Sequence, residues 1–288
     1  MKKEMVAKGL GFTEGPVILP DGRVAFCDQF ASGLYVYDGS GVAPLARTGG
    51  SPNGATLGSD GCLYVAQNGG VVGGWRAEQA IPPCIQRAHL DGTVETVCTA
   101  VAGHRLLAPN DICFGPDGRL YFTDPAHPYD PHNRSEDGRI YAIAPDGRGE
   151  MVIRLQPVYN NGLGFRPDGK LVWVESYTDE VRLLDEGRSV LLCTLPERHV
   201  PDGFAFAADG RLFIATLFSH GVTVLGPDGK ILDHLTLAED SCPTNCAFQD
   251  NVLWVTDVGD FVNKPGDARL WRVETDAQGL PMRVGCIY

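Results

Sequence analysis

Five side chains that carry a carboxylate or an amide recur at one fixed spacing along this chain of 288 residues. Each lies seven residues before the aspartate of a repeated "DG" turn; they are Glu14, Asn53, Asn110, Asn161 and Asp202. A sixth turn is one residue shorter, and its equivalent position is Thr244 or Asn245. All of these side chains offer oxygen atoms, and none is a Lys or Arg. Such donors suit a hard divalent cation, Ca²⁺, Mg²⁺ or Mn²⁺, better than Zn²⁺ or Fe²⁺.

A second set of polar side chains lies seven residues after the same turn aspartates. It comprises Asp28, Gln67, Asp124, Glu175, Thr216 and Asp257. Residues equally distant from a hairpin turn are expected to lie roughly opposite each other. Each hairpin would then carry two oxygen-bearing side chains at its open end. Two interpretations of the second set stay open, because a polar residue at a strand end can also simply satisfy backbone groups. Asn53, which precedes a glycine, can likewise cap a turn.

The turns that set this spacing belong to six similar units. The first hairpins span 19–28, 58–67, 115–124, 166–175, 207–216 and 249–257, and a looser second hairpin follows each of them. Four strands per unit of about 40–50 residues, repeated six times with little helical periodicity, are typical of a β-propeller. The prediction is an all-β fold, a single six-bladed propeller over residues 1–288. A linear solenoid is less consistent with four-stranded units that lack capping repeats.

In a propeller the first strand of every blade lines the central channel, so the five side chains and their sixth equivalent should form one ring. Two long polar segments, 69–84 and 125–138, interrupt the repeat and should wall the pocket above this ring. The candidate wall residues are Trp75, His104, Arg105, His127, Tyr129, Tyr177 and Phe218. The spacing of His127, His132 and His199 does not favour a second metal site.

Composition excludes several classes of function. The net charge is −12 and the isoelectric point is near 4.9, which disfavours nucleic acid as a partner. The chain has no apolar run near the roughly 20 residues of a membrane helix. Its start has no apolar segment of a signal peptide. Nine cysteines without a CxxC pair indicate reduced thiols, and hence a cytoplasmic protein. The sequence gives no oligomeric state.

Four segments resemble one known family. They read "FTEGPVILPDGR", "PNDICFGPDGRLYFTDP", "NNGLGFRPDGKLVWVES" and "VPDGFAFAADGRLFIA", and the likeness extends from about Gly9 to Asp257. In this order they resemble the SMP-30/gluconolactonase/luciferin-regenerating-enzyme family. The resemblance implies a six-bladed propeller with one catalytic divalent metal in its channel, usually calcium. It also implies hydrolysis of lactones, typically sugar lactones.

The resemblance assigns roles to individual residues. It makes Glu14, Asn161 and Asp202 metal ligands, with Asp202 also the acid/base, and it gives Asn110 to the metal or the substrate. The remaining substrate-side candidates are Asn53, Asp111, His127, Tyr129 and Tyr177. Asp111 either orients a water molecule or caps the turn. On chemical grounds as well, a carboxylate beside a metal can act as general base or as nucleophile.

One position departs from the family pattern. The sugar lactonases carry a substrate-binding Arg two residues before the Asn of the "ND" pair, and this chain has Ala108 there. A less polar γ- or δ-lactone would suit the missing arginine. Two alternatives to a lactonase stay open: a phosphotriesterase-like calcium propeller, and a non-catalytic binding propeller stabilised by its metal.

Overall fold

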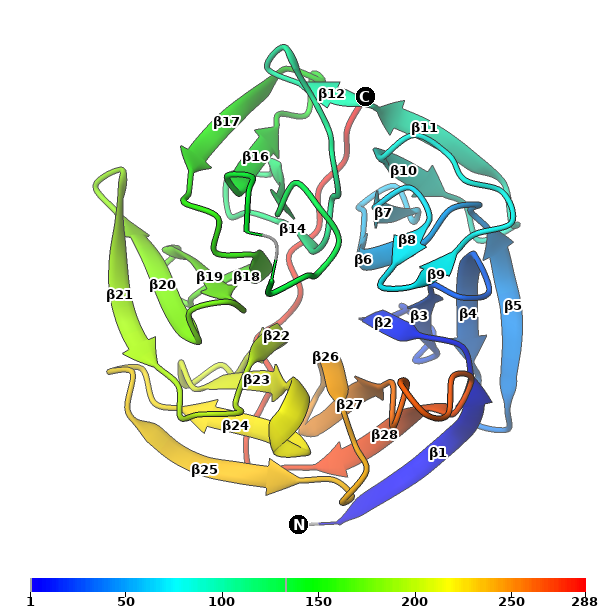
Figure 1. Cartoon of the computed structure of the whole chain (residues 1–288), viewed down its shortest axis with the longest axis vertical. Coiled ribbons are helices and arrows are strands. Elements are labelled where there is room, and N and C mark those ends of the chain that lie inside the picture. Colours follow the sequence, from blue (N-terminus) through cyan, green and yellow to red (C-terminus); the bar gives the residue numbers. More distant parts are fainter. Residues whose placement is uncertain (1, 133) are drawn as a thin grey trace.

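The computed structural model describes residues 2–132 and 134–288, and its strands radiate as six antiparallel sheets around a central axis (Figure 1). From the innermost strand outward, the first three sheets are β2 (Thr13–Ile18), β3 (Val24–Asp28), β4 (Gly33–Tyr37) and β5 (Val42–Arg47); β6 (Pro52–Leu57), β7 (Leu63–Gln67), β10 (Cys84–Ala88) and β11 (Val94–Cys98); and β14 (Ile112–Phe114), β15 (Leu120–Asp124), β16 (Arg139–Ile143) and β17 (Gly149–Arg154). This order confirms the predicted six-bladed propeller.

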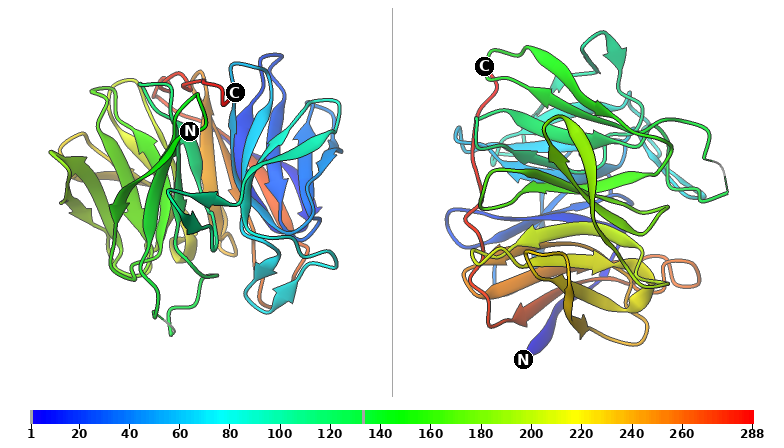
Figure 2. Two further views of the ribbon diagram at one scale, coloured as in Figure 1. Left: turned by 90° about the horizontal axis from the view of Figure 1, so that it is seen from above. Right: turned by 90° about the vertical axis from the view of Figure 1, so that its left-hand side faces the viewer.

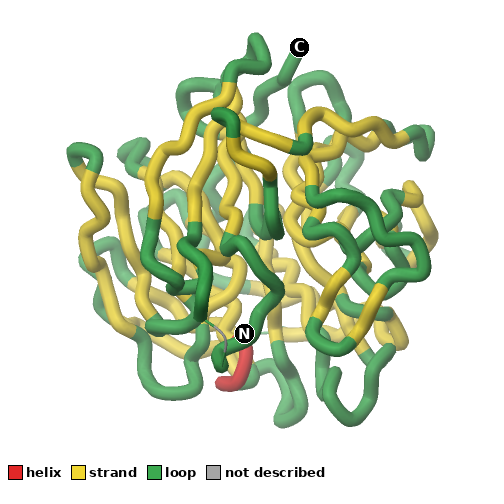
Figure 3. Tube along the Cα trace, turned by 45° about the horizontal axis from the view of Figure 1, so that its top comes forward, coloured by secondary structure: helices red, strands yellow, loops and turns green. Residues whose placement is uncertain are grey.

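The other three sheets complete the circle. They are β18 (Asn160–Phe165), β19 (Leu171–Glu175), β20 (Glu180–Asp185) and β21 (Arg188–Thr194); β22 (Pro201–Phe206), β23 (Leu212–Thr216), β24 (Gly221–Leu225) and β25 (Ile231–Thr236); and β26 (Pro243–Gln249), β27 (Val252–Asp257), β28 (Ala268–Glu274) and β1 (Lys3–Leu10). Strands dominate the trace in Figure 3, where the short 3₁₀ turn η1 (Leu217–Ser219) interrupts them.

The first and the last strand of the chain meet in the sixth blade. Its outermost strand is β1, which pairs antiparallel with β28 and so joins residue 3 to residue 273. The repeat alone had not revealed this strand, because β1 lies before the first "DG" turn. Pairing the chain's first strand with its last closes the ring of blades and leaves the inner strands in contact all the way around.

A one-residue register shift corrects the predicted hairpin geometry. Glu14 lies opposite Cys27, and Thr13 lies opposite Asp28, after a bulge that separates this end from the Val17 pair. The ladders of the second, fourth, fifth and sixth blades shift at the equivalent place. Bulges re-aim side chains. Consequently the residue seven before a turn is not opposite the residue seven after it, and the two sets do not share a face.

The second set has a structural role, as one of the two interpretations held. Asp28 accepts hydrogen bonds from the N–H groups of Gly11, Phe12 and Ala31 at 2.8–3.1 Å. Asp124 does the same for three backbone N–H groups in its own blade. These carboxylates fasten the segments on either side of each hairpin, since buried backbone donors need acceptors.

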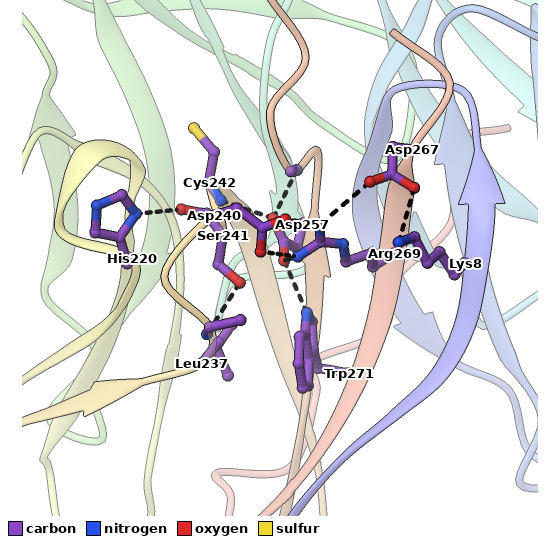
Figure 4. A network of polar contacts seen from close by, with 12 residues as sticks. Lys8, His220, Leu237, Asp240, Ser241, Cys242, Asp257, Asp267, Arg269 and Trp271 are labelled. Atoms are coloured by element: carbon purple, nitrogen blue, oxygen red, sulfur yellow. Dashed lines mark hydrogen bonds and ion pairs between the residues drawn. The ribbon is translucent and has the colours of Figure 1, made fainter. Parts of the chain in front are cut away.

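Figure 4 shows the same device in the sixth blade. Asp257 accepts from the Cys242 and Gly259 N–H groups and from Trp271 Nε1, at 2.7–2.8 Å. Beside it the buried Arg269 donates to both carboxylate oxygens of Asp240, at 2.8 and 2.6 Å. The network therefore has a structural role, because it holds β26, β27 and β28 together.

The two ends of the channel differ. The long segment 69–84 and the described parts of the second one, 125–132 and 134–138, project from one face of the disc, and the C-terminal tail runs across the opposite face (Figure 2). Part of the first segment forms a ribbon of β8 (Val71–Val72) and β9 (Trp75–Arg76), and a second ribbon of β12 (Ala100–Val101) and β13 (His104–Arg105) follows β11. The tail's Leu280, Pro281 and Met282 line a cavity at the covered end.

Candidate metal centre and substrate cavity

A cavity occupies the end of the channel from which the long segments project. Its floor carries the ring residues Glu14, Asn53, Asn110, Asn161 and Asp202. The rest of its lining is Phe12, Gln29, Asn68, Val71, Val72, Gly73, Pro128, Tyr129, Tyr159, Leu217, Phe218, Val258 and Phe261. The structure thus brings together five residues that lie up to 188 positions apart, as the spacing predicted.

Two buried carboxylates face this cavity, and none of the described residues that line it is a Lys, Arg or His. Glu14 is 3% exposed and Asp202 is 6% exposed. Burial, followed by the charges of Asp202 and Asp111, holds the pKa of Glu14 well above its usual range. Burial and the charge of Asp111 likewise raise the pKa of Asp202. Buried like charges that interact electrostatically oppose each other's ionisation unless a positive charge joins them.

The amides of Asn161 and Asn110 line the same cavity as the two carboxylates. Asn161 donates from Nδ2 to Ser176 Oγ at 3.2 Å, and Ser176 in turn donates to the Pro201 carbonyl at 2.7 Å. The Asn161 side chain also hydrogen-bonds to Asp202, which partly offsets the rise in the pKa of that carboxyl. The Oδ1 atom of Asn110 is buried and has no hydrogen-bond partner among the residues that the structure describes. A buried acceptor without a donor is costly, and a cation would satisfy it.

This donor set fits a hard divalent ion. Two carboxylates and neutral amide oxygens are the ligands that Ca²⁺ takes in proteins. Within the part of the chain that the structure describes, no group of three or more His, Cys, Asp or Glu side chains could hold a metal. A thiol and imidazole site of the zinc type is therefore not formed by the described residues, and any shell at Glu14 and Asp202 must include amides.

The residues that directly follow the ring positions form a second layer in the channel. This layer consists of four glycines and two polar residues: Gly15, Gly54, Asp111, Gly162, Gly203 and Asn245. Asn245 Nδ2 donates across the channel to Asp111 Oδ2 at 3.5 Å. A Cβ on Gly54 would meet Asp111 Oδ1 at 2.6 Å, and one on Gly203 would overlap the Asn245 amide. The glycines therefore make room for an Asp111–Asn245 pair that closes the channel below the ring.

Replacing Gly203 with Ala is expected to destabilise the protein by about 1–3 kcal/mol, because the new methyl group must displace Asn245. Denaturant unfolding measures the loss. Gly41→Ala is the matched control, since nothing lies within 4 Å of a Cβ built there. Its stability should stay within about 1 kcal/mol of the wild type. Equal effects of the two substitutions would contradict a tightly packed channel floor.

Asp111 belongs to the layer that closes the channel below the ring, and it does not line the substrate cavity. It lines the cavity at the tail-covered end. Its Oδ1 accepts from the Ile112 N–H at 2.8 Å, and burial raises its pKa to about 6. Of the two predicted roles, local capping is the one that the geometry supports. In the sixth blade, Thr244 was one of the two candidates for the ring. Its hydroxyl donates to the Thr13 carbonyl at 2.7 Å, and it does not line the cavity either.

Tyr159 is a cavity residue that the spacing argument missed. Its φ is +52°, a conformation that bulky residues adopt only when the surrounding structure compels it. Burial and the charges of Asp202, Tyr177 and Glu14 raise the pKa of its hydroxyl, so the group stays protonated. Tyr159 does not occupy one of the repeated positions, and the only sequence signal for its place in the cavity is that it lies two residues before Asn161.

An aromatic cluster supports Tyr159. The Tyr129 ring packs edge-on against it at 5.1 Å, and Tyr177 lies 5.2 Å away. His127 stacks on Tyr177 with the ring centroids 6.1 Å apart, and its Nδ1–H donates to the Pro128 carbonyl at 2.7 Å. Of the predicted wall residues, Tyr129 lines the cavity, whereas His127 and Tyr177 stand behind it.

The remaining predicted wall residues divide in the same way. Phe218 lines the cavity. Trp75 stacks on Phe30 at 5.0 Å, outside the lining, and His104 and Arg105 are exposed on β13. Ala108 is buried, and its N–H donates to Asp124 at 2.9 Å. No side chain from that position reaches the cavity.

The chain belongs to the SMP-30/gluconolactonase/LRE-like family, because the model of that region matches residues 12–259. The family resemblance noted in the sequence is thereby confirmed. In the described residues we find no helix with the length and apolar character needed to cross a membrane.

Two curated relatives resemble the chain in sequence, and a solved structure resembles it in fold. A gluconolactonase from Zymomonas mobilis subsp. mobilis is 25% identical over 283 residues, which cover 85% of this chain and 75% of the relative. The diisopropyl-fluorophosphatase of Loligo vulgaris is 26% identical over 210 residues, 66% of this chain and 64% of that protein. The solved structure of regucalcin from Agrobacterium tumefaciens, a calcium-binding protein, superposes with a TM-score of 0.73 at 15% identity, covering 97% of this chain and 94% of that one.

Proposed function

We propose that the protein is a metal-dependent hydrolase that opens lactones, with one divalent ion, Ca²⁺, held by Glu14, Asn110, Asn161 and Asp202. The observation that carries this proposal is the pair of buried carboxylates that face one cavity together with the unpartnered Asn110 oxygen. Membership of the gluconolactonase family and the Zymomonas gluconolactonase support the choice of a lactone.

A divalent ion bound there would supply a Lewis acid for the lactone carbonyl and would lower the pKa of a nearby water molecule. Asp202 then acts as the general base. It takes a proton from the attacking water as the water oxygen bonds to the carbonyl carbon. When the ring C–O bond breaks, the carboxyl of Asp202 returns that proton to the departing oxygen, and the product is a hydroxy acid.

The other residues hold the reactants. Glu14 supplies charge to the cation and has no proton-transfer role in this scheme, and Asn161 is positioned by Ser176. The protonated hydroxyl of Tyr159 can donate a hydrogen bond to a substrate oxygen. Neutral amide ligands preserve the positive charge of the site better than further carboxylates would, which favours polarisation of the carbonyl.

Phosphotriester hydrolysis is the second candidate, since the squid relative is named a diisopropyl-fluorophosphatase. A substrate panel decides between the two. The calcium-loaded protein is assayed with a γ-lactone, a δ-lactone and a phosphotriester. We expect a kcat/KM for at least one lactone that exceeds the phosphotriester value by about tenfold or more. Faster turnover of the phosphotriester would favour the second candidate, and turnover of neither would leave a binding propeller.

A further inference from the structure

We infer that the substrate of this cavity is an uncharged lactone that carries an alkyl or aryl substituent, and not a polyhydroxylated sugar lactone. This inference rests on the proposed lactonase function and names its substrate class. It comes from how polar and apolar side chains are divided between the floor and the walls of the cavity.

The walls above the ring are apolar. They are built by Phe12, Val71, Val72, Pro128, Leu217, Phe218, Val258 and Phe261, together with the rings of Tyr129 and Tyr159. These residues come from strand ends of the first, fourth, fifth and sixth blades and from both long segments. A substrate whose carbonyl lies at the ring must therefore direct its substituent into apolar surroundings, where burial of each methylene is favourable.

The described lining of the cavity offers no cationic side chain to pair with an anionic substituent. Among these residues there is no Lys, Arg or His. Its two carboxylates, Glu14 and Asp202, would balance the charge of a divalent ion, so the site would have no excess positive charge. A carboxylate or phosphate on the substrate would then be desolvated without a counter-ion, which is strongly unfavourable.

The polar residues outside the ring are largely engaged with each other. Asn68 donates to Gln29 Oε1 at 3.4 Å, and its own Oδ1 accepts from the Gly70 N–H at 3.2 Å and from the Ser51 hydroxyl. Gln29 is only 2% exposed. Each sugar hydroxyl buried without a partner would lower the affinity roughly 5- to 150-fold. Several such hydroxyls cannot be accommodated together.

The aromatic part of the wall is held in place by its own packing. Phe12 lies between Phe30, at 5.4 Å, and Phe261, whose ring meets it edge-on at 5.7 Å. Trp75 stacks behind Phe30 at 5.0 Å. A preorganised apolar wall gains affinity because little conformational freedom is lost when a substituent binds.

Three δ-lactones with the same six-membered ring test the inference: δ-decalactone with a pentyl group, unsubstituted δ-valerolactone, and glucono-δ-lactone. Each rate is corrected for spontaneous hydrolysis. Because each buried methylene adds roughly three- to fourfold, we expect kcat/KM for δ-decalactone to exceed that for δ-valerolactone by about thirtyfold or more. Glucono-δ-lactone should be slower than δ-valerolactone. Calorimetry with the corresponding lactams, which resist opening, should give the same order of affinities.

A matched pair of variants locates the effect. Phe261→Ser should lower the decalactone-to-valerolactone ratio about tenfold, whereas Val262→Ser, in the same loop but 74% exposed, should leave it unchanged. If glucono-δ-lactone is the best substrate, the inferred class is wrong while the lactonase proposal stands. If no lactone is opened by the metal-loaded protein, both fall together.

Discussion

Replacing Asp202 with Asn is expected to lower kcat/KM for lactone opening by about a thousandfold or more, because the variant keeps a ligand oxygen but cannot accept a proton. General base catalysis is typically worth about 10²–10⁴-fold. The side chain is 6% exposed, so bulk water does not easily replace it as the proton acceptor. Steady-state kinetics at saturating Ca²⁺ measure the effect.

A metal-binding measurement separates the two roles of Asp202. If Asp202→Asn still binds Ca²⁺ within about tenfold of the wild type while kcat falls, the lost function is proton transfer. Asp228→Asn is the control, since Asp228 lies in the exposed outer turn of the same blade and accepts from the Lys230 N–H. Activity above a tenth of the wild-type value in Asp202→Asn would contradict the assignment of the base.

Replacing Glu14 with Gln should weaken Ca²⁺ binding by about a hundredfold or more, because half of the ring's negative charge is removed. Where Ca²⁺ stabilises the wild type by about 2.7 kcal/mol, at a hundred times its Kd, the variant would gain only about 0.4 kcal/mol. Calorimetry and unfolding with and without Ca²⁺ measure both quantities.

Without metal, Glu14→Gln should change the stability of the protein in the opposite direction. The pKa of Glu14 is higher in the fold than in the unfolded chain, so its contribution to stability is present at low pH and is lost as pH rises through the folded value. At pH 8 the metal-free Glu14→Gln protein should therefore be more stable than the metal-free wild type, and at pH 4 the difference should shrink. Equal loss of stability with and without Ca²⁺ would indicate that Glu14 is a structural residue.

The ring could be predicted from the sequence because a repeat fixes its geometry. Once Asp117 marks a hairpin turn, the position of Asn110 on the inner strand follows, and five units repeat the same offset. The same counting could not predict the bulge that separates Glu14 from the Val17 pair, since a bulge depends on backbone conformation at Gly15 and not on a change in spacing. It therefore placed Asp28 opposite Glu14, whereas Asp28 lies opposite Thr13.

Residues outside the repeat were harder to place. Tyr159 reaches the cavity through a left-handed backbone conformation that no propensity predicts for tyrosine. Asp111 is adjacent to Asn110, but successive strand residues face different neighbours, and it pairs with Asn245 from the opposite side of the channel. The strand β1 carries no turn motif, and its partner lies more than 250 residues away.

The most direct test of the central claim is a calcium titration of lactone opening by protein first stripped of metal with a chelator. Ring opening of δ-valerolactone is followed by acid release at constant pH. The proposed centre predicts that the stripped protein is no faster than buffer and that activity rises to saturation with one Ca²⁺ bound per chain. Full activity in the stripped protein, or none at any Ca²⁺ concentration, would contradict a metal-dependent lactonase built on Glu14 and Asp202.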